Sequence, residues 1–368
     1  MTYIGLKDCR KFSFTLIFSL LLQITFSQNK FTPVDSWLRD NVAELGGRAV
    51  LQIYRNGKIV YSHSENNLSS RQKMIGKFIA KRRGKDADEI LKDFSPASRE
   101  MIASSSKWLS AALVMIFVDE GKINLEDSIG KFLPIMTQNG KGNIKLRQCL
   151  SHLTGIKAPE MKESIKEMKN IQSMDEAIDK IAHLPMEGAP GETFHYSSIG
   201  LQIAGAILER IAKQDFETIF HNKIALPCNM KNTDFGKGKV AMPAGGAYST
   251  TEDYMNFLEM ILHDGKFNGK QVISKNSIIK MQQNYTKRAT VASTPAEAGS
   301  WGYGFGEWVM EDAVDRSKTV TSPGLFGSFP WVDNEKKYAA FLMCHNLKNQ
   351  GRNEKYKELK ALVDSSLQ

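Results

Sequence analysis

One apolar segment, together with the short polar stretch directly before it, constrains the fold of this 368-residue chain most strongly. Every residue from 108 to 118 except Ser110 is apolar, and Gly121 follows at a position where helices commonly end in a left-handed residue. A helix that is apolar on nearly every side has to be buried. The sequence therefore predicts a central buried helix with residues 104–107 in its first turn.

Ser104 and Lys107 are three residues apart, so a helix places them on one face. A serine hydroxyl beside a lysine amine that has lost its water can act as a nucleophile at neutral pH. The same Ser-x-x-Lys spacing recurs, without a following apolar helix, at Ser27/Lys30, Ser70/Lys73, Ser128/Lys131 and Ser277/Lys280. Context thus favours Ser104 as the catalytic serine, and the alternative is an ordinary helix N-cap.

The N-terminus has the pattern of a secretory signal. Lys7, Arg10 and Lys11 precede an apolar stretch, residues 12–26, that polar residues interrupt and that is shorter than the about 20 residues of a membrane span. We expect a cleavable signal peptide over residues 1–27 and export to the periplasm or the exterior, with an uncleaved anchor as the alternative.

The cysteines after residue 27 are odd in number, which predicts no disulfide framework, and Cys149 and Cys344 are expected in the core.

Basic residues raise the formal net charge to +9 and are densest between residues 71 and 85. Such a cluster is most simply a solvated helix face, and the alternative is contact with an anionic membrane surface or cell-wall polymer. Base-stacking aromatic residues are not interleaved with it, so a nucleic acid is not an expected partner.

Hydrophobic patterns place strands at both ends of the chain and helices between them. A two-residue turn at Asn56-Gly57 is typical of a β-hairpin. Strands separated by helices in this way indicate a sheet domain that carries a helical insertion, which is an α+β fold. The expected elements are helices at 31–45 and 354–366, a charged helical segment reaching about residue 93, a helical region from about 122 to 235, and strands at 49–54, 59–61, 301–310, 325–332 and 338–343.

Six short motifs in a fixed order then carry a resemblance. The chain is similar to the serine β-lactamase-related hydrolases, which include class C β-lactamases, D-alanyl-D-alanine carboxypeptidases and carboxylesterases of the same fold. The motifs lie between about residues 48 and 346 and occupy positions 102–107, 120–127, 149–155, 190–198, 226–230 and 245–250.

The resemblance implies a β-lactamase/transpeptidase-like α+β fold, in which an antiparallel sheet flanked by helices receives an inserted helical subdomain. Residues 28–368 would form the catalytic domain, with the sheet subdomain at about 31–103 and 236–368 and the helical subdomain at about 104–235. Ser104 would attack an acyl carbon, with Lys107 as its base or proton relay. Tyr196 would shuttle a proton, with the Lys107 cation favouring its phenolate. The alternative for Tyr196 is an aromatic residue that caps the helix beginning near Ser198.

Two positions depart from the family pattern. Ser198 stands where the second motif usually has asparagine, which changes the contacts to substrate and to Lys107. Ser322-Pro323-Gly324 stands where Lys-Thr-Gly or His-x-Gly is usual on the strand that edges the site, so Ser322 is expected among the substrate-binding residues. Gly324 is kept and would let substrate approach closely. The backbone N–H groups of Leu325 and Ser104 would form the oxyanion hole.

Ser322 brings no cation for a substrate carboxylate, which both β-lactams and D-Ala-D-Ala peptides carry. We therefore expect esterase, amidase or peptidase activity in preference to potent β-lactamase activity, unless a distant Lys or Arg compensates. The expected substrate is a small-molecule or peptide acyl compound, with a cell-wall fragment as one candidate. The alternative function is a non-catalytic binding protein that recognises a cell-wall peptide or a related ligand.

Other hydrolase chemistries have less support. The chain has no Gly-x-Ser-x-Gly motif of α/β-hydrolases and no His-Glu-x-x-His motif, so neither a metal nor another cofactor is expected. His152 is the remaining candidate for a triad base, and the resemblance instead makes it a structural landmark near the site.

Overall fold

The computed structural model describes residues 30–160, 163, 170–346 and 351–368, so the predicted signal peptide lies outside the described residues. Its centre is a seven-stranded antiparallel sheet with strand order β2-β1-β13-β12-β11-β10-β9. The predicted α+β class with an antiparallel sheet is confirmed. The strands are β1 (Arg48–Arg55), β2 (Lys58–Asn66), β9 (Gly302–Tyr303), β10 (Trp308–Glu311), β11 (Thr319–Thr321), β12 (Phe329–Asp333) and β13 (Tyr338–Cys344).

Strands from the N-terminal and C-terminal parts of the chain lie side by side in this sheet. β1 pairs with β13, with Leu51 opposite Leu342. Asn56 and Gly57 have φ angles of 53° and 80°, which is the positive-φ pair that a two-residue hairpin turn requires. The predicted N-terminal hairpin is therefore confirmed, and the sheet is assembled from segments far apart in the sequence.

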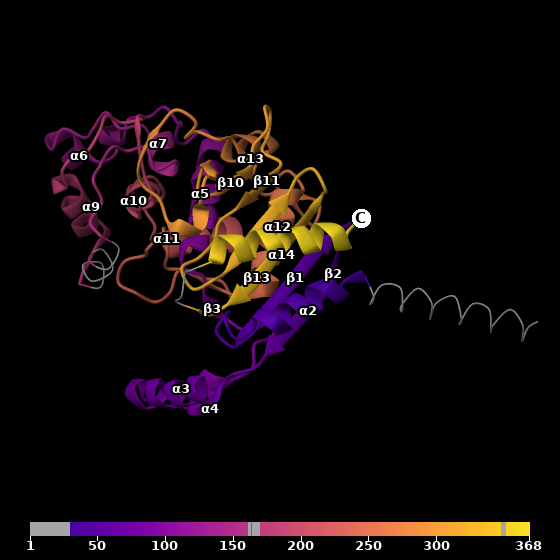
Figure 1. Cartoon of the computed structure of the whole chain (residues 1–368). Coiled ribbons are helices and arrows are strands. Elements are labelled where there is room, and N and C mark those ends of the chain that lie inside the picture. The colour runs from indigo at the N-terminus through magenta and orange to yellow at the C-terminus, as the bar shows by residue number, and fades with distance from the viewer. Residues whose placement is uncertain (1–29, 161–162, 164–169, 347–350) are drawn as a thin grey trace, which may run out of the picture.

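Side chains of β13 alternate between two cores because successive strand residues point to opposite faces. Ala340, Leu342 and Cys344 contact a core formed with helices α2 (Thr32–Asn41) and α14 (Arg352–Ser366). Phe341 and Met343 belong to the larger core on the other face, where α12 (Thr251–Leu262) packs against β13. Figure 1 shows α2 and α14 on the viewer's side of the sheet, and both predicted terminal helices are thus present.

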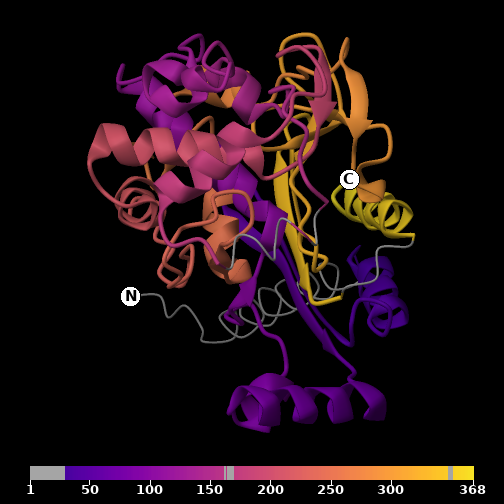
Figure 2. The same cartoon turned by 90° about the vertical axis from the view of Figure 1, so that its left-hand side faces the viewer.

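Most of the other helices gather beside the sheet and contribute side chains to the large core (Figures 1 and 2). They are α5 (Ser106–Asp119), α6 (Pro134–Gln138), α7 (Leu146–Leu150), α9 (Met174–His183), α10 (Ile199–Ala212), α11 (Phe216–Phe220) and α13 (Lys275–Met281), with short strands β3 (Glu100–Met101), β4 (Thr193–His195), β5 (Tyr248–Ser249), β6 (Lys266–Phe267), β7 (Lys270–Gln271) and β8 (Thr290–Ser293).

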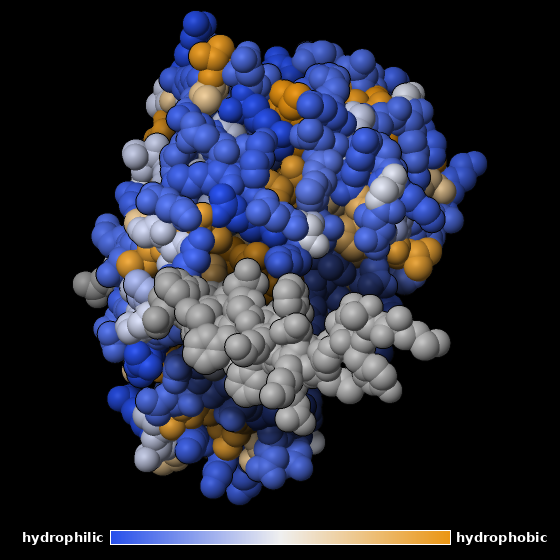
Figure 3. Space-filling view, turned by 90° about the vertical axis from the view of Figure 1, so that its right-hand side faces the viewer, coloured by the Kyte–Doolittle hydropathy of each residue, from blue (hydrophilic) through white to orange (hydrophobic). Residues whose placement is uncertain are grey.

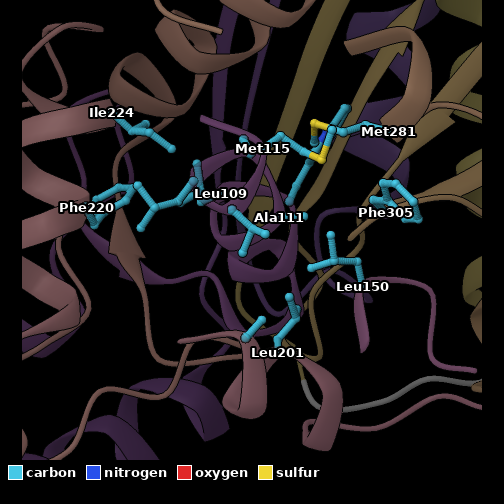
Figure 4. Packing of buried hydrophobic residues seen from close by; sticks show 14 of the residues in the cluster. Leu109, Ala111, Met115, Leu150, Leu201, Phe220, Ile224, Met281 and Phe305 are labelled. Atoms are coloured by element: carbon cyan, nitrogen blue, oxygen red, sulfur yellow. The ribbon is translucent and has the colours of Figure 1, made fainter. Parts of the chain in front are cut away.

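Helix α5 is the helix predicted from the apolar segment. All of its residues from Ser106 to Phe117 are buried, and Gly121 follows with a φ of 67°. Figure 4 shows Leu109, Ala111 and Met115 of this helix surrounded by side chains from other elements, among them Leu150 and Phe220. The buried packing fixes the position of the first turn of α5, where the candidate nucleophile lies.

A pair of helices, α3 (Ser70–Arg83) and α4 (Ala87–Leu91), extends away from the rest of the molecule (Figures 1 and 2). Gly84, with a φ of 63°, forms the left-handed end of α3. Within the described part of the chain, no helix combines the length and the apolarity needed to cross a membrane.

Two predicted strands differ from the structure. The segment 301–310 forms two short strands, β9 and β10, because Gly306 has a φ of 76° and turns the chain between them. The predicted strand at 325–332 begins only at Phe329, since a turn with Gly327 at a φ of 99° precedes it. Leu325 consequently lies in a loop beside the candidate site.

Candidate active site

Ser104 lies in a single turn of 3-10 helix, Ala103–Ser105, directly before α5. Ala103 has a φ of 44°, a left-handed conformation that costs a non-glycine residue roughly 1–2 kcal/mol. The Ser106 hydroxyl holds this turn by donating to the Ala103 carbonyl at 2.5 Å, and it accepts from the Ala247 N–H at 3.0 Å. Backbone strain of this kind is typical of functional sites, where surrounding contacts impose the geometry.

Lys107 supplies an amine beside the candidate nucleophile. Its Nζ lies 3.2 Å from the Ser104 Oγ and donates a 2.8 Å hydrogen bond to the Ala244 carbonyl. The residue is 3% exposed, and this burial lowers the pKa of Lys107 to about 7. A large fraction of this lysine is therefore neutral near pH 7 and able to accept a proton.

Tyr196 lies close to the same amine. Lys107 Nζ lies 4.7 Å from the centre of the Tyr196 ring. The ring centres of Tyr196 and Trp308 are 5.0 Å apart. Burial raises the pKa of Tyr196 well above its ordinary value, although hydrogen bonding with Ser104 and Trp308 acts in the opposite direction. The structure thus brings the three predicted residues together, but it favours a neutral phenol over the expected phenolate.

A pocket opens at Ser104 and Tyr196, and its space of about 460 Å³ includes open solvent at the mouth. Ser104 and Tyr196 line it together with several apolar side chains and one carboxylate. The other lining residues are Pro295, Glu297, Ala298, Trp308, Pro323, Gly324 and Leu325. An acyl group bound there would meet a mainly apolar wall beside the Ser104 hydroxyl.

Ser322 does not line this pocket. Its side chain is buried, and its hydroxyl donates to the backbone carbonyls of Gly306 at 3.1 Å and of Ser104 at 3.3 Å. Its own carbonyl accepts a 2.7 Å hydrogen bond from the Ser105 hydroxyl. Ser322 therefore positions the backbone around the nucleophile, in place of the predicted contact with substrate.

Gly324 and Leu325 both lie at the pocket, as the resemblance implied. A Cβ on Gly324 would stand 2.2 Å from the Ile102 carbonyl oxygen, so glycine is needed here for packing against the segment before Ser104. That reason differs from the expected close approach of substrate. Because Leu325 and Ser104 line one pocket, the oxyanion hole formed by their N–H groups stays a prediction that the geometry permits.

Ser198 is exposed at the start of α10. It is not a lining residue of the pocket, and within the described structure it makes no hydrogen bond to Lys107. The predicted role of Ser198 in contacting substrate and Lys107 has no support in this arrangement.

His152 packs beneath Tyr196 and takes no part in a Ser-His contact. Its Nε2 lies 3.1 Å from the Tyr303 hydroxyl, and its ring centre lies 4.7 Å from that of Tyr196. Burial and the nearby Lys107 and His195 lower the pKa of His152 well below its ordinary value. A neutral imidazole that supports two tyrosines fits the structural role favoured above.

Sequence reasoning missed Glu297, Trp308 and Arg352. Glu297 lines the pocket and accepts from Arg352 Nη1 at 3.2 Å, while the same guanidinium nitrogen donates to the Leu325 carbonyl at 2.9 Å. These residues lie outside the six motifs, and no spacing pattern in the sequence links positions 297 and 352.

No cluster of side chains suited to holding a metal ion occurs in the described ranges.

Comparisons with known proteins bear on the family and the fold. The family model described as Beta-lactamase matches residues 38–364. Protein Rv1367c of Mycobacterium tuberculosis is 25% identical over 286 residues, which are 62% of this chain and 71% of that protein. A Bacteroides dorei structure assigned as a beta-lactamase has a TM-score of 0.75 at 24% identity, covering 92% of this chain and 98% of the other. EstCE1, described as a hydrolase with promiscuous acyltransferase activity, has a TM-score of 0.71 at 17% identity, covering 93% and 100%.

Proposed function

The chain belongs to the Beta-lactamase family of hydrolases, and from this premise we propose that it cleaves an ester, amide or peptide bond through an acyl-enzyme on Ser104. The observation that carries the proposal is that buried Lys107 contacts both Ser104 and the Tyr196 ring, and that Ser104 and Tyr196 line one pocket. A nucleophile, a base that is neutral near pH 7 and a phenolic proton donor are the groups that acyl transfer requires.

In the first step, neutral Lys107 accepts the Ser104 proton across the 3.2 Å contact as the Oγ bonds to the acyl carbon. The carbonyl electron pair moves to oxygen, and the N–H groups of Leu325 and Ser104 would stabilise this oxyanion. The hydrogen bond from Lys107 to the Ala244 carbonyl occupies one amine hydrogen and keeps the nitrogen beside the serine.

The tetrahedral intermediate then collapses, and its bond to the leaving group breaks. Tyr196 would donate its proton to that group and regain one from protonated Lys107. A water molecule, deprotonated by neutral Lys107, attacks the acyl-enzyme and releases the acid with Ser104 restored. Lys107 passes the proton taken from water to the Ser104 oxygen as the acyl bond breaks. The leaving group keeps the Tyr196 proton, so serine, lysine and tyrosine each end the cycle in their starting protonation state.

The pocket favours a neutral acyl group. Glu297 places a carboxylate in the lining, and the Ser322 hydroxyl is turned toward backbone carbonyls. A substrate carboxylate would therefore meet a like charge and no cation from position 322. Small esters, and amides or peptides without a nearby carboxylate, suit the mainly apolar walls better than β-lactams do.

Ester turnover by the purified full chain tests this function. We expect hydrolysis of p-nitrophenyl acetate by the wild type and its loss in Ser104→Ala. Ser128→Ala is the matched control because Ser128 belongs to another Ser-x-x-Lys pair and its hydroxyl contacts Lys145 instead. A wild type that binds acyl ligands but turns over no ester or amide would favour the binding-protein alternative.

Export is a separate part of the proposal and depends on residues 1–27. If these residues are a cleaved signal, the protein recovered from the periplasm or medium should begin at Gln28. N-terminal sequencing of the recovered protein checks this, and an intact N-terminus on a membrane-bound form would support the anchor alternative.

A further inference from the structure

Helix α3 presents large apolar side chains to solvent at the tip of the projecting helix pair. Met74 and Phe78 are each 66% exposed, and Ile75 is 45% exposed. In Figure 3, hydrophobic residues lie at the surface of the lower end of the molecule, which is the end where α3 and α4 lie in Figure 1. Solvent-facing apolar residues grouped on one helix commonly mark an interaction surface.

The two faces of α3 have different tasks. Gly76 and Ala80 are buried, and a Cβ on Gly76 would lie 2.5 Å from Leu91 Cδ2 of α4. Met74 and Phe78 are four residues apart and therefore share a face, which points away from α4. The face toward α4 holds the pair of helices together, so the Met74–Phe78 face has no structural task within the described protein.

Cations surround this apolar face. Helix α3 contains no acidic residue, and its basic residues form no ion pair with any residue that the structure describes. Lys85, just beyond the helix, differs because it pairs with Glu89 at 2.7 Å. The basic residues of α3 are Arg71, Lys73, Lys77, Lys81, Arg82 and Arg83.

The helix pair is attached firmly to the sheet. Arg48 of β1 donates to the Ile90 carbonyl at 3.1 Å, and its guanidinium carbon lies 4.2 Å from the Phe94 ring centre. Asn66 of β2 exchanges two hydrogen bonds with the backbone of Phe94, at 2.8 and 3.0 Å. These contacts anchor α4 and the segment after it to the sheet, and α3 is held through its packing against α4.

We propose that this face of α3 docks onto an anionic lipid membrane, with Met74 and Phe78 inserted at the headgroup level and the flanking cations on lipid phosphates. A lipid interface satisfies both kinds of side chain, because it offers negative charge beside hydrocarbon. A soluble polyanion would neutralise the cations but leave Met74 and Phe78 in water. A second copy of the chain would bring two sets of like charges together across a twofold interface.

Vesicle co-sedimentation of the purified full chain tests the proposal. We expect binding to vesicles of phosphatidylglycerol and phosphatidylcholine, and little binding to phosphatidylcholine alone. Because each cation near an anionic surface contributes roughly fivefold to partitioning, Lys77→Gln/Lys81→Gln should weaken binding by about 25-fold. Met74→Ser/Phe78→Ser should weaken it at least tenfold. The controls Lys266→Gln/Lys270→Gln and Val314→Ser, all exposed positions outside α3, should change it less than twofold.

A second readout locates the contact, because other segments could also bind vesicles. Phe78→Trp should give a tryptophan signal, obtained by subtracting the wild-type spectrum, that shifts to the blue and is quenched by brominated lipids. Equal vesicle binding by all variants, or no quenching of the introduced tryptophan, would overturn the proposal. If Lys77→Gln/Lys81→Gln loses binding while Met74→Ser/Phe78→Ser keeps it, the occupant of the face would be a polyanion. If the protein binds no vesicles but forms a dimer that Met74→Ser/Phe78→Ser dissociates, the occupant would be a second copy of the chain. Thermal melts of each variant verify that the fold is intact.

Discussion

The Nζ of Lys107 lies over the face of the Tyr196 ring, 4.7 Å from its centre. A cation in this position would be stabilised by the ring, yet burial is the larger influence and lowers the pKa of Lys107 to about 7. Burial also raises the pKa of Tyr196, which keeps the phenol protonated. The pair therefore suits a lysine that accepts the serine proton and a tyrosine that donates to the leaving group.

The pH dependence of acylation follows from Lys107. Its neutral form is the base, so kcat/KM should fall about tenfold per pH unit below a midpoint near 7 and reach a plateau above it. Hydrolysis of p-nitrophenyl acetate between pH 5.5 and 8.5 measures this profile. Lys107→Arg should be inactive across the range because its guanidinium stays charged. A flat profile, or a midpoint near 10, would be inconsistent with a buried lysine base.

Tyr196→Phe separates proton donation from nucleophilic attack. An alkyl ester or amide needs its leaving group protonated, so kcat/KM for these substrates should fall about 10²–10⁴-fold. p-Nitrophenolate leaves without a proton, and its ester should lose less than tenfold. Tyr303→Phe is the control, because Tyr303 contacts His152 in the same aromatic cluster. Equal losses on both substrate types would contradict the role assigned to Tyr196.

Glu297 should select against substrates that carry a carboxylate. We expect slow turnover of nitrocefin by the wild type, as the absence of a cation at Ser322 also predicts. Glu297→Gln removes a negative charge from the pocket lining, which should raise kcat/KM for nitrocefin about fivefold relative to the neutral ester, a change of about 1 kcal/mol. Glu192→Gln at an exposed site is the control. Rapid wild-type turnover at micromolar nitrocefin would show that another residue holds the carboxylate.

Glu307 should lower the stability of the fold at neutral pH. It is fully buried, and neither carboxylate oxygen has a hydrogen-bond partner in the described part of the chain, so burial raises its pKa well above its ordinary value. The folded state then holds a proton that the unfolded state releases, and stability falls as pH rises above the unfolded pKa near 4.3, by about 1.4 kcal/mol per unit until the folded pKa is reached.

Glu307→Gln removes this penalty, so its free energy of unfolding should exceed that of the wild type at pH 7 and converge with it near pH 4. Denaturant titrations at both pH values measure the difference, with Glu192→Gln as an exposed control. A Glu307→Gln protein that is less stable at pH 7 would indicate an ionised carboxylate in the fold.

The central helix could be predicted from sequence because its signal is local. The apolar run before Gly121 predicts a helix that is buried on every side. Helical spacing alone then places Ser104 and Lys107 together at its first turn. The hairpin at Asn56-Gly57 is of the same kind, since a two-residue turn determines the pairing of its strands.

The far side of the site could not be predicted in this way. Ser322 occupies the expected position in the sequence, but its hydroxyl is turned toward the backbone by contacts with Gly306, which is distant in sequence. The pairing of Glu297 with Arg352 likewise forms only when the 3-10 turn before β9 meets the start of α14. Side-chain direction at these positions depends on tertiary contacts that carry no periodic pattern.

Covalent labelling identifies the nucleophile of the acyl-enzyme. The full chain is incubated with a fluorophosphonate, digested, and analysed by mass spectrometry. We predict a single adduct, located on Ser104. It should be absent from Ser104→Ala and present in Ser128→Ala, and it should form much more slowly in Lys107→Arg. An unlabelled wild type, or an adduct on any other serine, would contradict the assignment of Ser104 as the nucleophile.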